Sequence, residues 1–130
     1  MKLLDTNICI AWLSDADRGV RRQLTALEPG DAVLCSVVKA ELLYGARKSA
    51  KPAANLSKLE TLFSLFDSLP FDDAASEEYG SLRAQLEAAG TPLRANDLLI
   101  AAIALANDAT VVTRNEDEFR RVPGLRVEVW

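Results

Sequence analysis

Short apolar runs alternate with longer segments of helical spacing along the whole 130-residue chain. Two of the runs, "AVLCS" and "ATVVT", are rich in the branched residues that strands favour. Strands that alternate with helices are typical of a parallel sheet covered by helices on both faces. We therefore predict an α/β fold with a mainly parallel central sheet, formed by a single domain over residues 1–130.

The limits of the expected elements follow from apolar periodicity and from turn residues. Strands are predicted at residues 2–4, 32–36, 68–71, 109–113 and 125–130. Helices are predicted at residues 7–14, 19–27, 37–49, 54–66, 73–89, 96–108 and 115–119. We expect Ser36 to cap the helix that follows it, and helix 96–108, apolar on nearly every side, to be buried.

The chain has no histidine and only two cysteines. Without histidine, the Ser-His-Asp, Cys-His and two-histidine ribonuclease mechanisms and the usual zinc sites are excluded. Cys9 and Cys35 lie in apolar surroundings and form no Cys-x-x-Cys pair, so we expect two reduced thiols in the core. Any chemistry must therefore use carboxylates, together with metal ions.

The bulk composition narrows the class of protein further. A hydrophobic content of 49% excludes disorder, and no apolar run approaches the roughly 18 to 20 residues that span a membrane. There is no signal-peptide pattern, so we expect a soluble cytoplasmic protein. The net charge of −4 argues against broad nonspecific binding of nucleic acid. Carboxylates loaded with divalent cations would nevertheless reverse the local charge.

Three acidic residues stand where ligands bind in α/β proteins. Asp5 follows the first strand, and ligands lie beyond the carboxyl ends of strands, although a helix cap or a solvated strand end also explains this residue. Glu41 lies on a largely apolar side of its helix and so requires a partner, either Arg, Lys or a ligand. Asp97 opens the most apolar helix, where the helix dipole also favours an acid.

A fourth acidic position follows the strand at 109–113. The residues that can reach the same edge of the sheet are Asn115, Glu116, Asp117 and Glu118. Carboxylates that converge about 4 Å apart repel each other by roughly 4 kcal/mol at an effective dielectric constant of 20. Divalent cations would relieve this repulsion, and a set of oxygen ligands favours Mg²⁺ or Mn²⁺.

Four segments resemble the characteristic segments of PIN-domain ribonucleases of the VapC toxin type. In order, they are "LLDTNICI", "VVKAELLYGARKS", "GTPLRANDLLIAAIAL" and "VVTRNEDEFRRVPGLRVEVW". The resemblance covers essentially the whole chain and implies a three-layer α/β/α sandwich. It also implies a metal-dependent endoribonuclease that is the toxin of a toxin–antitoxin pair, a homodimer, and an antitoxin on a separate chain that blocks the site.

The resemblance also implies which acids form the site. They are Asp5, Glu41 and Asp97. Many members of the family have a fourth acid directly after the strand, where this chain has Asn115, and others have one at the position of Glu118. Asp117 is a further candidate, so the identity of the fourth acid stays open.

The implied mechanism is hydrolysis of RNA by a metal-activated water. Asp5 and Asp97 would hold Mg²⁺, with Mn²⁺ as a substitute, and Glu41 would orient or deprotonate the water or bridge to a second ion. Glu118 or Asp117 would complete the ligand shell. In-line attack would leave a 5′-phosphate and a 3′-hydroxyl.

Further residues near this edge have two interpretations each. Thr6, Asn7 and Thr113 either orient the acidic ligands or serve turns and caps. Arg94 and Arg114, together with Arg47 and Lys48, either bind RNA phosphates or remain solvated. The segments are most similar to the VapC branch that cleaves tRNA in the anticodon region, initiator tRNA included.

Two other classes of protein share some of these features. An aspartyl-phosphate phosphatase or receiver domain would use Asp5 as nucleophile, but it needs a second acid beside that residue and a lysine at a later strand end. Thr6 and Asn7 follow Asp5, and the last two strands carry no lysine. A catalytically inactive PIN-like binding module is the other class, and Asn115 is the residue that leaves it open.

Overall fold

The computed structural model describes all 130 residues and contains one five-stranded sheet. The strands are β1 (Lys2–Leu4), β2 (Ala32–Cys35), β3 (Asp67–Leu69), β4 (Thr110–Thr113) and β5 (Val127–Val129). Their order across the sheet is β3-β2-β1-β4-β5, and every neighbouring pair is parallel. The predicted parallel sheet is therefore confirmed.

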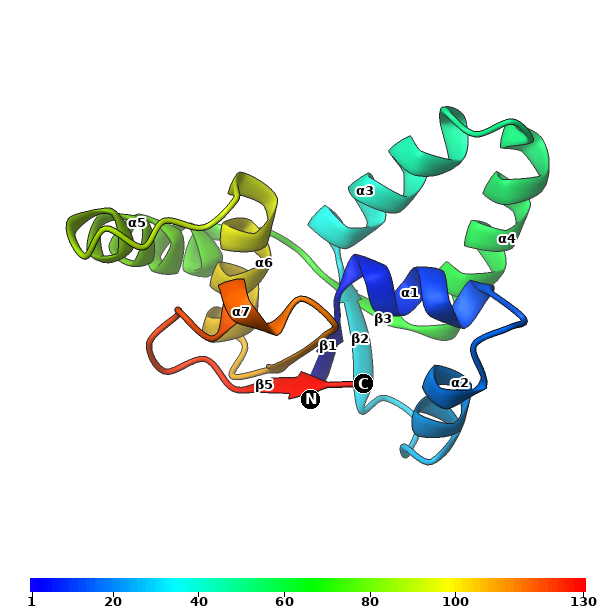
Figure 1. Cartoon of the computed structure of the whole chain (residues 1–130), viewed down its shortest axis with the longest axis horizontal. Coiled ribbons are helices and arrows are strands. Elements are labelled where there is room, and N and C mark those ends of the chain that lie inside the picture. Colours follow the sequence, from blue (N-terminus) through cyan, green and yellow to red (C-terminus); the bar gives the residue numbers. More distant parts are fainter.

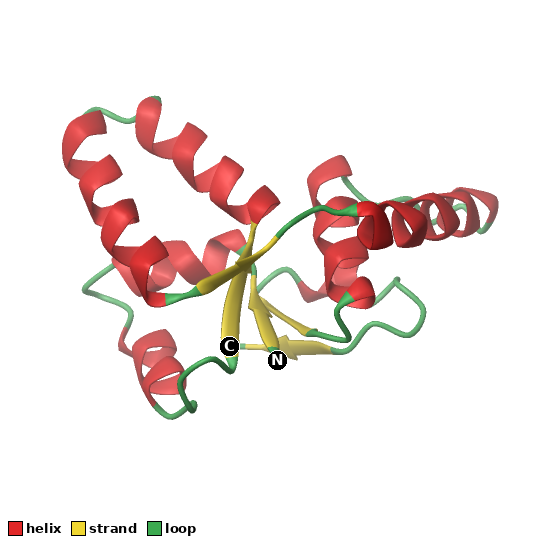
Figure 2. Cartoon of the chain, turned by 180° about the vertical axis from the view of Figure 1, so that it is seen from behind, coloured by secondary structure: helices red, strands yellow, loops and turns green.

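Seven helices cover the two faces of this sheet. They are α1 (Thr6–Leu13), α2 (Arg18–Thr25), α3 (Ser36–Arg47), α4 (Pro52–Leu65), α5 (Asp73–Ala88), α6 (Ala95–Ala106) and α7 (Glu116–Phe119). Figure 1 shows α1 to α4 on one side of the strands and α5 to α7 on the other, and Figure 2 shows the same layers from behind. Right-handed crossovers explain this division, because the chain moves from β1 to β3 in one direction and then returns past β1 to β4 and β5.

Local sequence signals set several helix limits. The Asp72 carboxylate caps α5 by accepting a hydrogen bond of 3.0 Å from the backbone N–H of Ala75. Pro52 opens α4, where its missing N–H is not needed. Gly90 follows α5 with a φ of +74°, a conformation that glycine adopts without strain. Every predicted element is present, with ends that differ by one or two residues.

The predicted capping role of Ser36 is wrong. Helix α3 begins at Ser36 itself, and the preceding Cys35 is the extended residue, with φ −137° and ψ 165°. No side chain caps this helix. A capping side chain must come from the residue outside the helix, and the helical geometry starts one residue earlier than the apolar pattern indicates. The Ser36 side chain is consequently left exposed.

The core is continuous across both helical layers. Leu3, Leu34 and Ile100 are fully buried, and half of the residues of α6 are buried, which agrees with the prediction of a buried helix. Cys9 and Cys35 are buried and unpaired, as expected for core thiols. Truncation of a fully buried aliphatic side chain costs about 2–5 kcal/mol, so this core holds the ends of the central strands firmly in place. No helix combines the length and the apolarity needed to cross a membrane.

Candidate active site

A pocket of about 450 Å³ lies at the edge of the sheet where β1 and β4 end. Its walls come from α1, α3 and the start of α6, which surround the central strands in Figure 1. The lining residues are Asp5, Thr6, Asn7, Ile10, Glu41, Arg94, Ala95, Asn96, Asp97 and Asn115. We call it the acidic pocket, because the three acids selected from the sequence share it.

Asp5 is held in place through both carboxylate oxygens. Oδ1 accepts a hydrogen bond of 2.8 Å from the backbone N–H of Thr6, and Oδ2 accepts one of 2.7 Å from the hydroxyl of Thr113. The side chain is only 5% exposed, and burial raises the pKa of Asp5 above its usual value, although the two hydrogen bonds oppose the shift. The residue is therefore both the cap of α1 and a carboxylate facing the pocket.

Glu41 has no basic partner. Its Oε1 accepts a hydrogen bond of 3.0 Å from the hydroxyl of Thr6, and none of the ion pairs of the protein includes it. The alternative of an Arg or Lys partner is thus not realised in the structure. Thr6 joins the first two acids, because its backbone binds Asp5 while its side chain binds Glu41.

Asp97 is partly buried in the first turn of α6 and shares a hydrogen bond with Glu118 of α7. Burial, this hydrogen bond and the negative charges of Asp5, Glu118 and Glu41 raise the pKa of Asp97 to about 8. The same hydrogen bond lowers the pKa of Glu118. The Asp97–Glu118 pair therefore binds a proton more readily than isolated carboxyl groups do when no cation is near.

Among the residues after β4, Glu118 is the acid that reaches this group. Its carboxylate contacts Asp97, accepts a long hydrogen bond of 3.5 Å from the Asn115 side chain and lies 3.7 Å from Nε of Arg94. Asp117 is exposed and does not line the acidic pocket. The structure thus joins Glu118 to the other acids and places Asp117 outside them.

The donor set fits a hard divalent cation, although the acids do not form a preformed cage. No three acidic side chains stand close enough together to bind one ion. Mg²⁺ commonly keeps several waters and binds through only one or two carboxylates, so a cage is not required. A cation in the acidic pocket would also relieve the repulsion that raises the pKa of Asp97.

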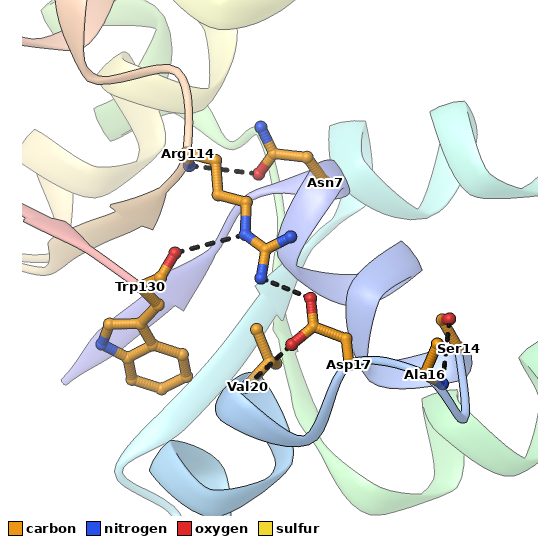
Figure 3. A network of polar contacts seen from close by, with 7 residues as sticks. All are labelled: Asn7, Ser14, Ala16, Asp17, Val20, Arg114 and Trp130. Atoms are coloured by element: carbon orange, nitrogen blue, oxygen red, sulfur yellow. Dashed lines mark hydrogen bonds and ion pairs between the residues drawn. The ribbon is translucent and has the colours of Figure 1, made fainter.

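The two arginines selected from the sequence lie in different surroundings. Arg94 precedes α6, lines the acidic pocket and has a side chain that is 83% exposed. Arg114 forms a neighbouring cluster, shown in Figure 3, with Asp17, Asn7 and the carbonyl group of Trp130. Its guanidinium lies 2.5 Å from Asp17 and 3.2 Å from that carbonyl oxygen. We call these four residues the Arg114 cluster.

Sequence reasoning missed two residues at this edge. Asn96 lines the acidic pocket directly before Asp97, and the polar pair "ND" at the start of an apolar helix was the available signal. Asp17 caps α2 through Val20 and pairs with Arg114, a residue 97 positions later. No local pattern in the sequence indicates this second contact.

Comparisons with known proteins identify the family of the chain. Residues 2–125 match the PIN domain family. A tRNA(fMet)-specific endonuclease VapC of Shigella flexneri is 41% identical over 128 residues, which cover 98% of this chain and 96% of that protein. Ribonuclease VapC2 of Rickettsia felis is 40% identical over 129 residues, with the same coverage of both chains.

Solved structures of VapBC assemblies contain chains with the fold of this protein. The VapBC2 structure from Rickettsia felis, bound to a DNA fragment from the promoter, contains a chain that matches with a TM-score of 0.94 and 38% identity, over 99% of this chain and 98% of that one. The DNA-bound VapBC structure from Salmonella typhimurium matches with a TM-score of 0.93 and 36% identity, over 99% and 97%. The three-layer fold expected from the sequence is confirmed.

The fold and the pocket of acids at the carboxyl edge define a nuclease-type α/β domain, and the chain belongs to the PIN domain family. Its relatives within that family are VapC ribonucleases, so the resemblance to the VapC type is confirmed. The expected class of enzyme, a ribonuclease that hydrolyses RNA, is confirmed with it.

Proposed function

We propose that the protein is a Mg²⁺-dependent endoribonuclease that cleaves tRNA as the toxin of a toxin–antitoxin pair. The observation that carries the proposal is the convergence of Asp5, Glu41 and Asp97 on one pocket that contains no strong basic partner for Asp5 or Glu41. Such an arrangement costs stability, and a cation with a phosphodiester substrate would compensate for it.

Asp5 and Asp97 are the residues proposed to hold the ion, with Mn²⁺ able to replace Mg²⁺. When bound, the ion supplies neutralisation of the scissile phosphate and activation of water. Thr113 and the backbone of Thr6 keep the Asp5 carboxylate oriented toward the pocket. Asp97 must release its proton before it can serve as a ligand, which ties its role to the pH.

Glu41 and Glu118 supply the remaining acid–base groups. Glu41 is proposed to orient or deprotonate the attacking water, and the hydroxyl of Thr6 fixes one of its two oxygens. Glu118 is the proposed fourth acid, because its side chain is hydrogen-bonded to Asp97. Asp117 remains a weaker candidate for this role, since its side chain is exposed and makes no contact with Asp97.

The RNA is proposed to contact Arg94 and Arg114. Arg94 offers an exposed guanidinium at the acidic pocket, while Arg114 must share its guanidinium with Asp17. Two relatives are named as tRNA(fMet)-specific endonucleases, which supports initiator tRNA, cut in the anticodon region, as the target.

The proposed partner is an antitoxin on a separate chain. Solved relatives are VapBC toxin–antitoxin assemblies, and this similarity supports a cognate antitoxin here. A homodimer and a location in the cytoplasm complete the proposal. Light scattering of the purified chain, alone and with its antitoxin, measures the two stoichiometries.

Brief expression followed by sequencing of cellular RNA ends tests the function, with Asp5→Asn as the control. The expected result is new 5′-phosphate ends in the anticodon region of one or few tRNAs, and their absence in the control. Equal numbers of new 5′-phosphate ends in the strains that express the wild type and Asp5→Asn would contradict the proposal. Incubation with acetyl phosphate tests the aspartyl-phosphate alternative, which requires a stable adduct on Asp5.

A further inference from the structure

The acidic pocket continues into a second depression that the proposed mechanism does not use. This second pocket has a volume of about 790 Å³ and lies between α1, α3 and α6. Thr6, Ile10, Glu41 and Asn96 line both pockets, so a ligand with its reacting group beside Glu41 can extend from one into the other. Its volume lies within the range of roughly 300–1,000 Å³ that is typical of ligand sites.

Tyr44 provides an unused aromatic surface in the second pocket. At 67% it is the most exposed large hydrophobic side chain of the protein. It lines the pocket and follows Glu41 by three residues on α3, so both side chains point to the same side of the helix. A ring that is not packed into the core and faces a pocket beside the acids is available to stack on a planar ligand.

Lys48 adds a positive charge to this ring. Its ammonium lies 5.0 Å from the centre of the Tyr44 ring, and the residue lines the same pocket. None of the ion pairs in the structure includes Lys48. The ammonium lies over one face of the ring and makes no ion pair, so the other face and the positive charge match the two parts of a nucleotide, a base that stacks and a phosphate that carries negative charge.

Two polar side chains complete the lining of the second pocket. Ser36 at the start of α3 and Asn96 at the start of α6 both line it and are exposed. A hydroxyl and an amide together offer donors and acceptors for the edge of a base. Ser36 is free for this contact because it does not cap α3.

We propose that the second pocket binds one unstacked nucleotide of the RNA, next to the phosphodiester in the acidic pocket. The base stacks on Tyr44, the phosphate pairs with Lys48, and Ser36 and Asn96 contact the edge of the base. The proposal rests on the ribonuclease function given above and adds a subsite that selects single-stranded loops, because a paired A-form helix does not expose the face of a base.

Steady-state cleavage of tRNA tests the subsite. Tyr44→Ala is expected to raise KM about tenfold with little change in kcat, since stacking contributes to binding and not to bond cleavage. Tyr44→Phe keeps the ring and is expected to stay within about twofold of the wild-type KM. Lys48→Gln is expected to raise KM and to reduce the salt slope by about one phosphate contact.

Matched controls come from exposed residues outside both pockets. Leu65→Ala removes an apolar side chain that is 57% exposed, and Lys51→Gln removes an exposed charge. Neither control is expected to change KM. Because Tyr44 and both control side chains are exposed, all variants are expected to fold, which circular dichroism checks.

A binding measurement separates the subsite from the cleavage reaction. The probe is a stem–loop RNA with 2-aminopurine in its loop, added to Asp5→Asn protein so that it is not cut. Stacking on Tyr44 quenches the fluorescence, and adding Tyr44→Ala to the same protein is expected to abolish the quenching. If the wild type fails to cleave RNA while this quenching persists, the ribonuclease proposal fails and the subsite stands.

Two results would overturn the subsite itself. The first is that the wild-type enzyme cleaves RNA and the Tyr44→Ala substitution changes neither KM in the cleavage assay nor the quenching in the binding assay. The other is a Tyr44→Ala variant that cleaves normally but binds the antitoxin more weakly, which would assign this surface to the antitoxin.

Discussion

The acidic pocket and the Arg114 cluster lie at the same edge of the protein, but the pKa values of their carboxyl groups are shifted in opposite directions. In the acidic pocket, burial and neighbouring carboxylates raise the pKa of Asp5 and of Asp97. In the Arg114 cluster, the hydrogen bond from the guanidinium lowers the pKa of Asp17. Asp5, Asp17 and Asp97 all lie at helix starts. The surroundings nevertheless disfavour the charged form of Asp5 and Asp97 and favour that of Asp17.

Under the proposed function, this difference separates the residues that bind a ligand from those that stabilise the fold. Asp17 has its counter-charge within the chain and caps α2 as well, so nothing further is needed to satisfy it. Asp5, Glu41 and Asp97 are held by hydroxyls, by a backbone N–H and by another carboxyl group, none of which neutralises their charge. We propose that a bound cation supplies the missing positive charge.

The largest expected effect is on catalysis in Asp5→Asn and Asp97→Asn. Each variant is expected to lose about a thousandfold or more in RNA cleavage, because a proposed ligand of the ion loses its charge. Metal-free melting temperature should stay equal or rise, since a repulsive charge has been removed. Asp17→Asn is the matched control from the other cluster and should retain cleavage. Unfolding of either active-site variant would show that the residue is structural.

The next effect is stabilisation by metal. Mn²⁺ or Mg²⁺ at a hundredfold excess over its Kd is expected to stabilise the wild type by about 2.7 kcal/mol. Asp97→Asn should show a much smaller shift in the same thermal melt, and Asp17→Asn the full shift. If neither ion changes the melting temperature of the wild type, this result would argue strongly against a cation in the acidic pocket.

The pH dependence of metal-free stability gives a smaller effect. The pKa of Asp97 is raised from 3.8 to about 8 in the folded protein, so between these values the folded state holds a proton that the unfolded state has released. Stability should therefore fall as the pH rises from about 4 to about 8, and Asp97→Asn should flatten this fall. With Mg²⁺ the direction should reverse, because the ion displaces the proton more easily at high pH. Denaturant melts at several pH values measure both trends.

The smallest effect concerns the two arginines. Arg94→Gln is expected to raise KM for tRNA more than Arg114→Gln, because Arg94 is 83% exposed at the acidic pocket with only a long contact to Glu118, while Arg114 is engaged by Asp17 at 2.5 Å. Arg114→Gln should instead lower the melting temperature slightly. The charge-swapped pair, Arg114→Asp with Asp17→Arg, should restore the melting temperature only in part, because it reforms the ion pair but loses the Asp17 cap of α2. A large rise in KM in Arg114→Gln without loss of stability would make this arginine a direct RNA contact.

Local patterns were sufficient for the elements and for the choice of acids. The β-branched runs and the helical spacing depend on neighbouring residues only, so every strand and helix was predicted to within one or two residues at its ends. The carboxyl-edge rule and burial arguments made Asp5, Glu41 and Asp97 candidates, and the resemblance to the VapC type selected them. The single error in capping, at Ser36, came from a shift of one residue, which local propensity does not resolve.

The partners of those acids were decided by the tertiary structure alone. Thr113 binds Asp5 across 108 positions of the chain, and Asp17 binds Arg114 across 97. Glu118 joins Asp97 only because α7 packs against α6. The sequence determined the fold class, the family and the acids, since these depend on local preference and on matching segments. Whether a carboxylate finds a neutralising partner depends on which strand ends lie next to each other. The packing of the sheet and its helices decides this.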